Sequence, residues 1–333
     1  MIISLAAAGD VVGVLEAFWR GSLGTSSAFF SGTLVRAIPL SIVGVGIAIA
    51  FRAGVFNIGG EGQLLLGAVA ATVVGLPWSH GLGVAGVAIA LVASAVAGAA
   101  WAGIAAVLRA RFGVLEVIST IMLNFIAANF VSYLVRGPLQ EPTHVYPQTE
   151  LISTSVRLPR LWAETRLHAG IVIAAAVAVG AWWFLTRTAA GFRIRAVGAS
   201  TTASRVTGRV NVERVSAVAL VASGALAGFA GGIEVTGVTY ALYENLSPGY
   251  GFSAIAVAIL ARLHPLAICG TALLFATLET GALGMQRDAG VPSVVASALE
   301  ALVILAVVAM TGRFVRIPWR TVRPRASDAG VAA

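Results

Sequence analysis

The chain has 333 residues, 58% of them apolar and 11% charged, and its mean hydropathy is +0.92. Because a soluble domain carries about 25% charged residues, this composition excludes a soluble globular protein and indicates a polytopic membrane protein. All 22 basic residues are Arg, so the chain cannot contain the phosphate-binding loop that ends in Gly-Lys-Ser or Gly-Lys-Thr, and any ATP that drives it binds to another subunit.

Nine apolar segments approach the roughly 20 residues that cross a bilayer. They are residues 34–51, 57–75, 83–108, 114–135, 169–186, 212–232, 251–262, 264–285 and 294–311. The segment 251–262 is too short to cross alone, so it starts near Tyr240 or belongs to a broken span. Residues 1–20 contain Asp10 and Glu16 and form either a partial first span or a helix on the membrane surface. We predict an all-α polytopic membrane protein, a single domain over residues 1–333 with about nine to ten transmembrane helices and at least one broken or short span.

The distribution of Arg predicts the orientation, because cytoplasmic loops are enriched in basic residues. With Arg52 inside and the spans alternating, 15 of the 22 Arg face the cytoplasm. This bias explains the pI near 10.9 better than nucleic-acid binding does. The Pro-containing loop 136–168 is then extracytoplasmic, whereas the loop 187–213 and the tail 313–333, and hence the C-terminus, are cytoplasmic.

The stretch 52–67 places Asn57, Glu61 and Gln63 among four glycines, between two apolar runs. A carboxylate in hydrocarbon costs several kcal/mol unless it faces a cavity or a partner, and glycine lets the backbone leave helical geometry. Asn57 and Glu61, four residues apart, would share one helical face. These groups are candidates for the solute path or its gate. The alternative is that Glu61 pairs with an Arg or with backbone amides and only locks a bent helix.

The segment 114–135 carries further polar groups. Glu116 lies in the first turn at the inner end, where the helix dipole favours a carboxylate, so we expect a structural role for it. Asn124 and Asn129 lie deeper and are candidates for the path or for hydrogen bonds between helices. Glu279 and Glu300 lack an Arg partner at helical spacing, which leaves their pairing open.

Glycines at positions 224, 228 and 232 follow a four-residue spacing that permits close contact between helices, and we expect packing there rather than solute contact. The single Cys269 excludes an internal disulfide and a thiolate zinc site. The four His are scattered without paired spacing, so no metal site is expected. No grouping of nucleophile, base and orienting residue indicates an enzyme.

The loop 187–213 is polar and rich in Arg. Its middle, residues 198–208, has Ser and Thr before a short Ala-containing stretch and glycines at both ends, which favours a helix of about two turns. Such a helix along the inner face is either a contact for a soluble partner or a solvated connector.

Four blocks of sequence resemble the permease subunits of ATP-binding-cassette importers, in the nucleoside and simple-sugar branch of the family that also includes branched-chain amino acid permeases. They are Phe51-Arg-Ala-Gly-Val-Phe-Asn-Ile-Gly-Gly-Glu-Gly-Gln63, Glu116-Val-Ile-Ser-Thr-Ile-Met-Leu-Asn124, Gly191-Phe-Arg-Ile-Arg-Ala-Val-Gly198 and Ser247-Pro-Gly-Tyr-Gly-Phe-Ser-Ala-Ile-Ala-Val-Ala258, in the family's order. Two departures are the short first span and Ala261, where the family would have Gly.

The resemblance implies a transport subunit with no enzymatic activity or cofactor of its own, ATP and magnesium being bound by a partner ATPase. Two such subunits, the same or related, would form the path, and an extracytoplasmic binding protein would deliver the solute. The chain would lie in lipid, in a bacterial inner or plasma membrane, with no nucleic-acid partner. The expected solute is a nucleoside, with a simple sugar as the alternative.

The same resemblance makes the cytoplasmic loop the ATPase-coupling element. Its candidate residues are Gly191, Arg193, Arg195, Gly198, Ala203 and Gly208. A rival hypothesis is an ion-coupled secondary transporter that uses Glu61, Glu279 or Glu300 as a proton site, in which case the coupling loop would be idle.

Overall fold

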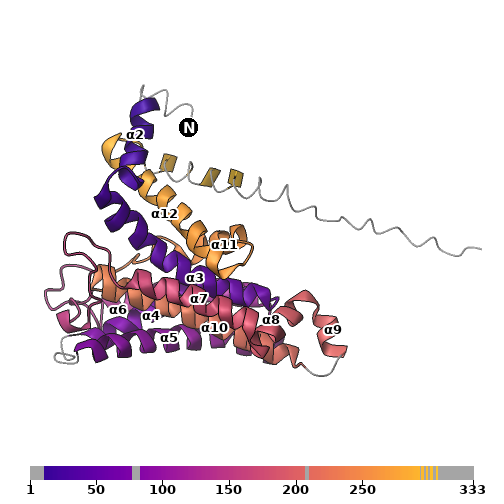
Figure 1. Cartoon of the computed structure of the whole chain (residues 1–333). Helices are drawn as coiled ribbons and strands as arrows, with labels where there is room; N and C mark the ends of the chain where they lie inside the picture. Colours follow the sequence, from indigo (N-terminus) through magenta and orange to yellow (C-terminus); the bar gives the residue numbers. More distant parts are fainter. Residues whose placement is uncertain are drawn as a thin grey trace, which may run out of the picture.

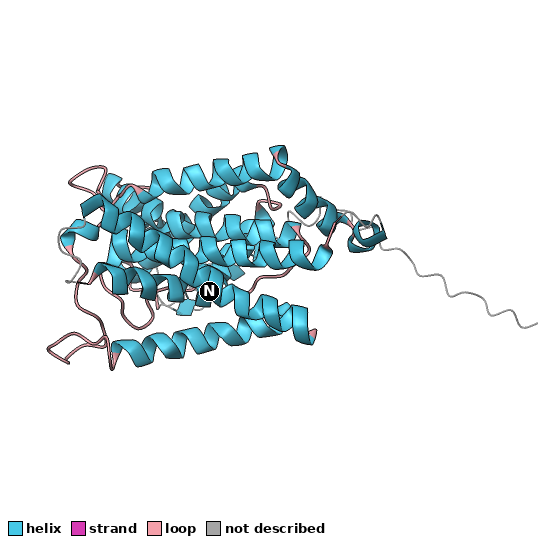
Figure 2. Ribbon diagram, turned by 90° about the horizontal axis from the view of Figure 1, so that it is seen from below, coloured by secondary structure: helices cyan, strands magenta, loops and turns pink. Residues whose placement is uncertain are grey.

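The computed structural model describes residues 11–76, 83–206 and 210–292, together with residues 294, 295, 298, 301, 302, 305 and 306. This part of the chain is helical, with no strand and only two isolated β-bridges, which confirms the predicted all-α class. Figure 1 gives the order of the helices, and Figure 2 shows that most of them lie side by side along one direction.

Six helices are long and apolar enough to cross a membrane. They are Ala28–Arg52 (η1, Ala28–Thr33, continued by α3, Leu34–Arg52), α5 (Gly83–Phe112), α6 (Glu116–Val135), α7 (Gly170–Arg187), Val212–Thr239 (α10, Val212–Glu234, continued by η4, Val235–Thr239) and α12 (Pro265–Asp288). Two apolar helices are shorter, α4 (Gly60–Gly75) and α11 (Tyr250–Leu260). The remaining helices are α2 (Val11–Ser22), η3 (Thr154–Val156), α8 (Ala189–Ala199) and α9 (Thr201–Val206).

The prediction of a polytopic membrane protein with at least one broken or short span is confirmed. The expected nine to ten complete spans are not found, since six described helices reach the necessary length. The difference has two sources: α4 and α11 have 16 and 11 residues and are too short to count as complete spans, and the predicted span 294–311 falls mostly outside the described residues.

Left-handed backbone marks both places where a span is broken. After α3 the chain turns at Gly54, with φ of +72°, and continues without helix to Gly59. After η4 it turns at Tyr240 (φ +58°), Asn245 (φ +57°) and Gly249 (φ +100°) before α11 begins. A positive φ ends regular helix and is easiest for glycine. The glycines of the 52–67 stretch therefore act as predicted, whereas nothing in the sequence marked Tyr240 and Asn245 as turn residues.

Close glycine contacts join α10 to α4 and α5 at the centre of the bundle. A Cβ added to Gly67 of α4 would lie 2.1 Å from the carbonyl oxygen of Gly228, and one added to Gly98 of α5 would lie 2.2 Å from that of Gly224. Gly232 likewise meets the side chain of Ser94 at 2.4 Å. The packing role predicted for the spaced glycines of α10 is confirmed.

Helices α2 and α12 lean away from this centre (Figure 1). They pack on each other where a Cβ on Gly21 would lie 2.6 Å from the Cα of Gly284. With 12 residues, α2 is too short to cross a bilayer, and residues 1–10 lie outside the described part. Their contact with α3 is made by side chains, among them Thr33 and Thr280, whose hydroxyl oxygens are 2.9 Å apart.

Candidate functional site

A network of buried amides holds the non-helical segment that precedes α4. Asn57 is fully buried, and its Nδ2 donates to Gln63 Oε1 at 2.8 Å and to Ser223 Oγ of α10 at 2.9 Å. Its Oδ1 accepts from the backbone N–H of Gly59 at 2.9 Å and from Gln63 Nε2 at 3.0 Å. Buried amides need such partners, and here they replace the hydrogen bonds that a continuous helix would have supplied.

Asn124 extends this network from α6. Its Oδ1 accepts from the N–H of Gly62 at 2.9 Å, and its Nδ2 donates to the carbonyl of Ile58 at 2.8 Å. Asn129 is instead exposed and donates to the carbonyl of Phe125 within its own helix. The structure thus brings together Asn57, Gln63 and Asn124 but not Asn129.

Glu61 joins the two broken spans. Its carboxylate accepts a 2.7 Å hydrogen bond from the N–H of Gly251 in the first turn of α11, and Ser247 Oγ accepts from Gly249 and Tyr250 at 3.2 and 3.0 Å. The first N–H groups of a helix have no partner within it, so these two side chains cap α11. Because a Cβ on Gly251 would lie 2.1 Å from the Glu61 nitrogen, the starts of α4 and α11 touch directly.

A cavity of about 1000 Å³ opens near these helix starts, on the side of the long loop 136–168. It is bounded by η1, α3, the end of α10, the segment 240–250 and α12. The polar side chains that line it include Ser31, Arg36, Arg166, Glu234, Tyr243, Asn245, Tyr250 and Thr280. None of the five predicted path residues lines it, and its lining comes from segments that are far apart in the sequence.

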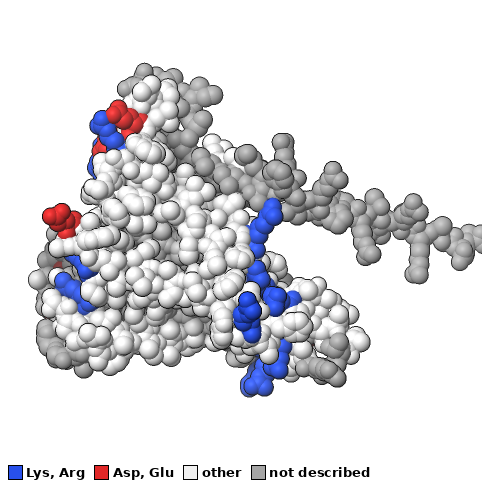
Figure 3. All heavy atoms as spheres, in the orientation of Figure 1, with Lys and Arg blue, Asp and Glu red and all other residues white. Residues whose placement is uncertain are grey.

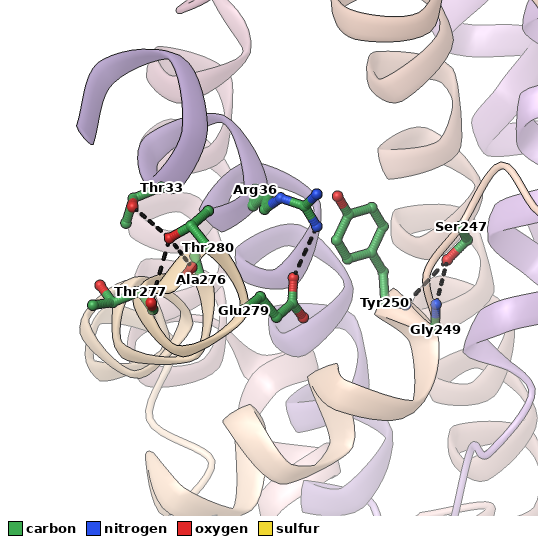
Figure 4. A network of polar contacts seen from close by, with 9 residues as sticks. All are labelled: Thr33, Arg36, Ser247, Gly249, Tyr250, Ala276, Thr277, Glu279 and Thr280. Atoms are coloured by element: carbon green, nitrogen blue, oxygen red, sulfur yellow. Dashed lines mark hydrogen bonds and ion pairs between the residues drawn. The ribbon is translucent and has the colours of Figure 1, made fainter. Parts of the chain in front are cut away.

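An ion pair crosses from α3 to α12 beside this cavity. Arg36 Nη1 lies 3.4 Å from Glu279 Oε2, and Figure 4 shows the ring of Tyr250 pointing toward the Arg36 guanidinium. Glu279 therefore has the Arg partner that was not visible at helical spacing, because the two residues are 243 positions apart. Glu116, expected to be structural, similarly pairs with Arg109 at 3.0 Å.

The loop 136–168 holds the second broken span. Backbone N–H groups of Thr149 and Ile152 donate to the carbonyls of Leu242 and Tyr240 at 2.9 and 2.8 Å. Arg136 donates twice to Glu244, at 2.6 and 2.7 Å. The loop 136–168 therefore hydrogen-bonds along the segment 240–244 that precedes α11, and these bonds couple the positions of the two segments.

His168 anchors the end of this loop. Its ring is fully buried against Gly170 and Gly237, whose added Cβ atoms would each lie 2.5 Å from the His168 Cε1, and its Nδ1 accepts from the N–H of Gly170 at 3.1 Å. Burial, and secondarily the charge of Arg166, lowers the pKa of His168 from 6.5 to about 4. The ring is therefore neutral at physiological pH.

At the opposite end of the molecule, α8 lies against the point where α3 ends. A Cβ on Gly198 would lie 2.0 Å from the carbonyl oxygen of Arg52 and 3.3 Å from the nitrogen of Gly54. Arg52 Nε in turn donates to the carbonyl of Leu263, in the turn after α11, at 2.9 Å. The contact point on α8 thus touches the end of α3, and Arg52 links that end to the turn after α11.

The predicted coupling residues divide into packed and exposed ones. Gly191 is buried, and a Cβ there would lie 2.2 Å from the carbonyl oxygen of Phe184. Arg193, Arg195 and Ala203 are exposed, whereas Gly208 lies outside the described residues. On the face drawn in Figure 3 the charged side chains near this end are basic, and the acidic Glu116 and Glu213 at this end pair with Arg109 and Arg205. The predicted helix within 198–208 is the six-residue α9, and α8 before it was not predicted.

Short apolar helices joined to non-helical segments, beside a polar cavity, are features of membrane-embedded transport proteins. Residues 29–308 match the family described as branched-chain amino acid transport system / permease component. The chain belongs to this family, and it is a membrane subunit of an ATP-binding-cassette transport system.

Individual relatives agree with this assignment. The chain is 38% identical over 311 residues to the guanosine ABC transporter permease protein NupP of Bacillus subtilis, covering 91% of this chain and 87% of that one. It is 37% identical over 293 residues to the glucose ABC transporter permease protein TsgB13 of Haloferax volcanii (84% and 76%). It is 32% identical to the nucleoside ABC transporter permease protein NupB of Lactococcus lactis (91% and 85%). No solved structure matches the chain.

Proposed function

We propose that the chain forms half of the path of an ATP-driven importer for nucleosides, and that the solute enters through the outer cavity. The cavity carries the proposal: at about 1000 Å³ it lies in the upper range of small-molecule sites, and it combines charged groups, an amide and two Tyr. Relatives named for guanosine and nucleosides favour a nucleoside. The relative named for glucose makes a simple sugar the second candidate.

Asn57, Glu61, Gln63 and Asn124 serve the gate in this proposal rather than contact the solute. Their amides and carboxylate are engaged with each other, with Ser223 and with backbone groups. Such saturation favours the bent-helix alternative over direct solute contact. Asn129, exposed on α6, has no part in this gate.

Coupling to ATP hydrolysis would pass through α8 and α9, with Arg193 and Arg195 facing the ATPase. The contact of Gly198 with Arg52 and Gly54 would pass a displacement of α8 to the broken spans. The two ATPase states must hold α8 differently, because equal binding to both states shifts nothing. Gly191, Ala203 and Gly208 complete the predicted element.

The topology has nine crossings if each short apolar helix, with its non-helical segment, counts as one and residues 294–311 form the last. The loop 136–168 is then extracytoplasmic and available to a binding protein, and the C-terminus is cytoplasmic. A second permease subunit would complete the path in a bacterial inner or plasma membrane.

Reconstitution of the complete importer tests this function. Proteoliposomes that contain the permease pair, the ATPase and the binding protein should accumulate tritiated guanosine when ATP is supplied on the side of the membrane where the ATPase lies. Glucose uptake without guanosine uptake would favour the sugar permease. Uptake driven by a proton gradient without ATP would refute the ATP-driven mechanism.

A further inference from the structure

Glu234 is a carboxylate on the cavity wall that no hydrogen bond or ion pair in the described part of the chain reaches. It lies in the last turn of α10 with 6% of its surface exposed. Glu234 differs in this respect from Glu61 and Glu279, whose carboxylates accept from donors of the protein. A buried carboxylate without a donor is costly, and a solute bound in the cavity would supply such donors.

Donors from the protein stand on the other walls of the cavity. Arg36 and Arg166 both line it and act electrostatically on Glu234. Arg36 has further N–H groups that can donate to a solute, because one of its nitrogens pairs with Glu279 and a guanidinium has five N–H donors. Tyr250 contributes a ring next to Arg36 (Figure 4).

A neutral solute bound in this cavity would therefore donate to Glu234 and accept from Arg36. Two adjacent hydroxyl groups do both, because each hydroxyl has one donor hydrogen and two acceptor lone pairs, and two oxygens of a carboxylate can accept from two neighbouring hydroxyls. Both solute classes under consideration carry such a pair, the 2′ and 3′ hydroxyls of a ribonucleoside and the ring hydroxyls of a sugar.

We propose that Glu234 is the specificity-determining residue of the outer cavity and binds the vicinal hydroxyls of the solute's sugar, with Arg36 donating to the same hydroxyl oxygens. The proposal rests on the proposed nucleoside importer. It assigns recognition of the sugar to the permease in addition to any selection by the binding protein.

The test compares guanosine with 2′,3′-dideoxyguanosine in the reconstituted importer, at concentrations that saturate the binding protein with either solute. Wild-type and Glu234→Gln importers are measured side by side, and inosine, which lacks the 2-amino group, is the base control. The matched control variant is Glu150→Gln, at an exposed carboxylate that does not line the cavity. Size-exclusion profiles show whether each variant assembles.

A hydrogen bond to a charged group contributes enough for at least about a tenfold effect. We expect Glu234→Gln to slow guanosine and inosine uptake about tenfold and to leave the slow uptake of the dideoxy compound unchanged, whereas Glu150→Gln behaves as wild type. Equal slowing of all three solutes would overturn the proposal in favour of a structural role. If Glu234→Gln slowed guanosine uptake relative to inosine uptake but left the preference for hydroxyl-bearing solutes intact, Glu234 would be assigned to the base, and the proposal would be overturned. Absence of guanosine uptake by the wild-type importer would instead refute the nucleoside function on which the proposal rests.

Discussion

The contact of α8 with the end of α3 makes Gly198→Ala the most direct test of coupling. The added Cβ would lie 2.0 Å from the Arg52 carbonyl oxygen. Since ordinary contact between carbon and a carbonyl oxygen is about 3.3 Å, α8 would have to move by about 1.3 Å. The change should separate α8 from the broken spans while leaving the surface of α8 that faces the ATPase unaltered.

The sign of the change in helix stability distinguishes a steric clash from a weakened α8 as the cause of any loss of coupling in Gly198→Ala. Replacing a helical Gly by Ala normally stabilises a helix by about 0.5–1 kcal/mol, so a loss of coupling here would come from the clash and not from a weaker helix. The matched control is Gly180→Ala in the interior of α7, where no atom lies within 4 Å of the added Cβ. That variant should transport as wild type.

The assay measures guanosine taken up per ATP hydrolysed in proteoliposomes with the cognate ATPase and binding protein. Gly198→Ala should insert, should still co-purify with the ATPase and should fall about tenfold in this ratio, as expected when a displacement of about one ångström disrupts a positioning contact. A wild-type ratio in Gly198→Ala would refute the idea that α8 acts through Arg52 and Gly54.

Three further changes probe other parts of the structure. Glu61→Gln weakens a 2.7 Å charge-assisted bond to the Gly251 N–H, a type of bond that contributes about 1.5–3 kcal/mol, and should reduce uptake more than membrane expression; unchanged uptake would leave Glu61 a structural residue only. Arg195→Glu should reduce co-purification of the ATPase without preventing insertion, and an unaltered yield of ATPase would contradict its place at that interface. His168 has a pKa of about 4 when folded and 6.5 normally, so the unfolded state binds more protons between these values and stability falls as the pH drops through this window. Thermal unfolding should reveal about 2 kcal/mol less stability at pH 5 than at pH 7.5, and a His168→Gln variant with the same pH dependence as wild type would show that another group is responsible.

Hydrophobic length predicted the helices closely because a membrane imposes it. The expected segments 83–108, 114–135 and 169–186 correspond to α5, α6 and α7 with ends that differ by at most a few residues. The glycine-flanked polar stretch also gave the position of the first break. These features depend on residues that are neighbours in the chain, so local composition contains them.

The cavity could not be predicted in the same way. Arg36 and Glu234 line it and Glu279 pairs with Arg36, from three helices that are far apart in the sequence, and each residue by itself looks like an isolated charge in an apolar run. The second break was only half visible, as a span that was too short. Its turn residues Tyr240 and Asn245 have positive φ because the loop 136–168 and α11 hold them there, which is a tertiary constraint.

The glycine contacts of α10 divide the molecule mechanically. Where Gly67, Gly98, Gly224 and Gly228 meet, no side chain lies between the backbones, so α4, α5 and α10 have nothing that can change rotamer to permit sliding. Helix α12 instead meets α3 and η1 through the side-chain pairs Arg36–Glu279 and Thr33–Thr280, and side chains of this kind can change rotamer. The glycine-packed group therefore has less freedom to slide than the contacts that α12 makes with η1 and α3, which lie beside the cavity.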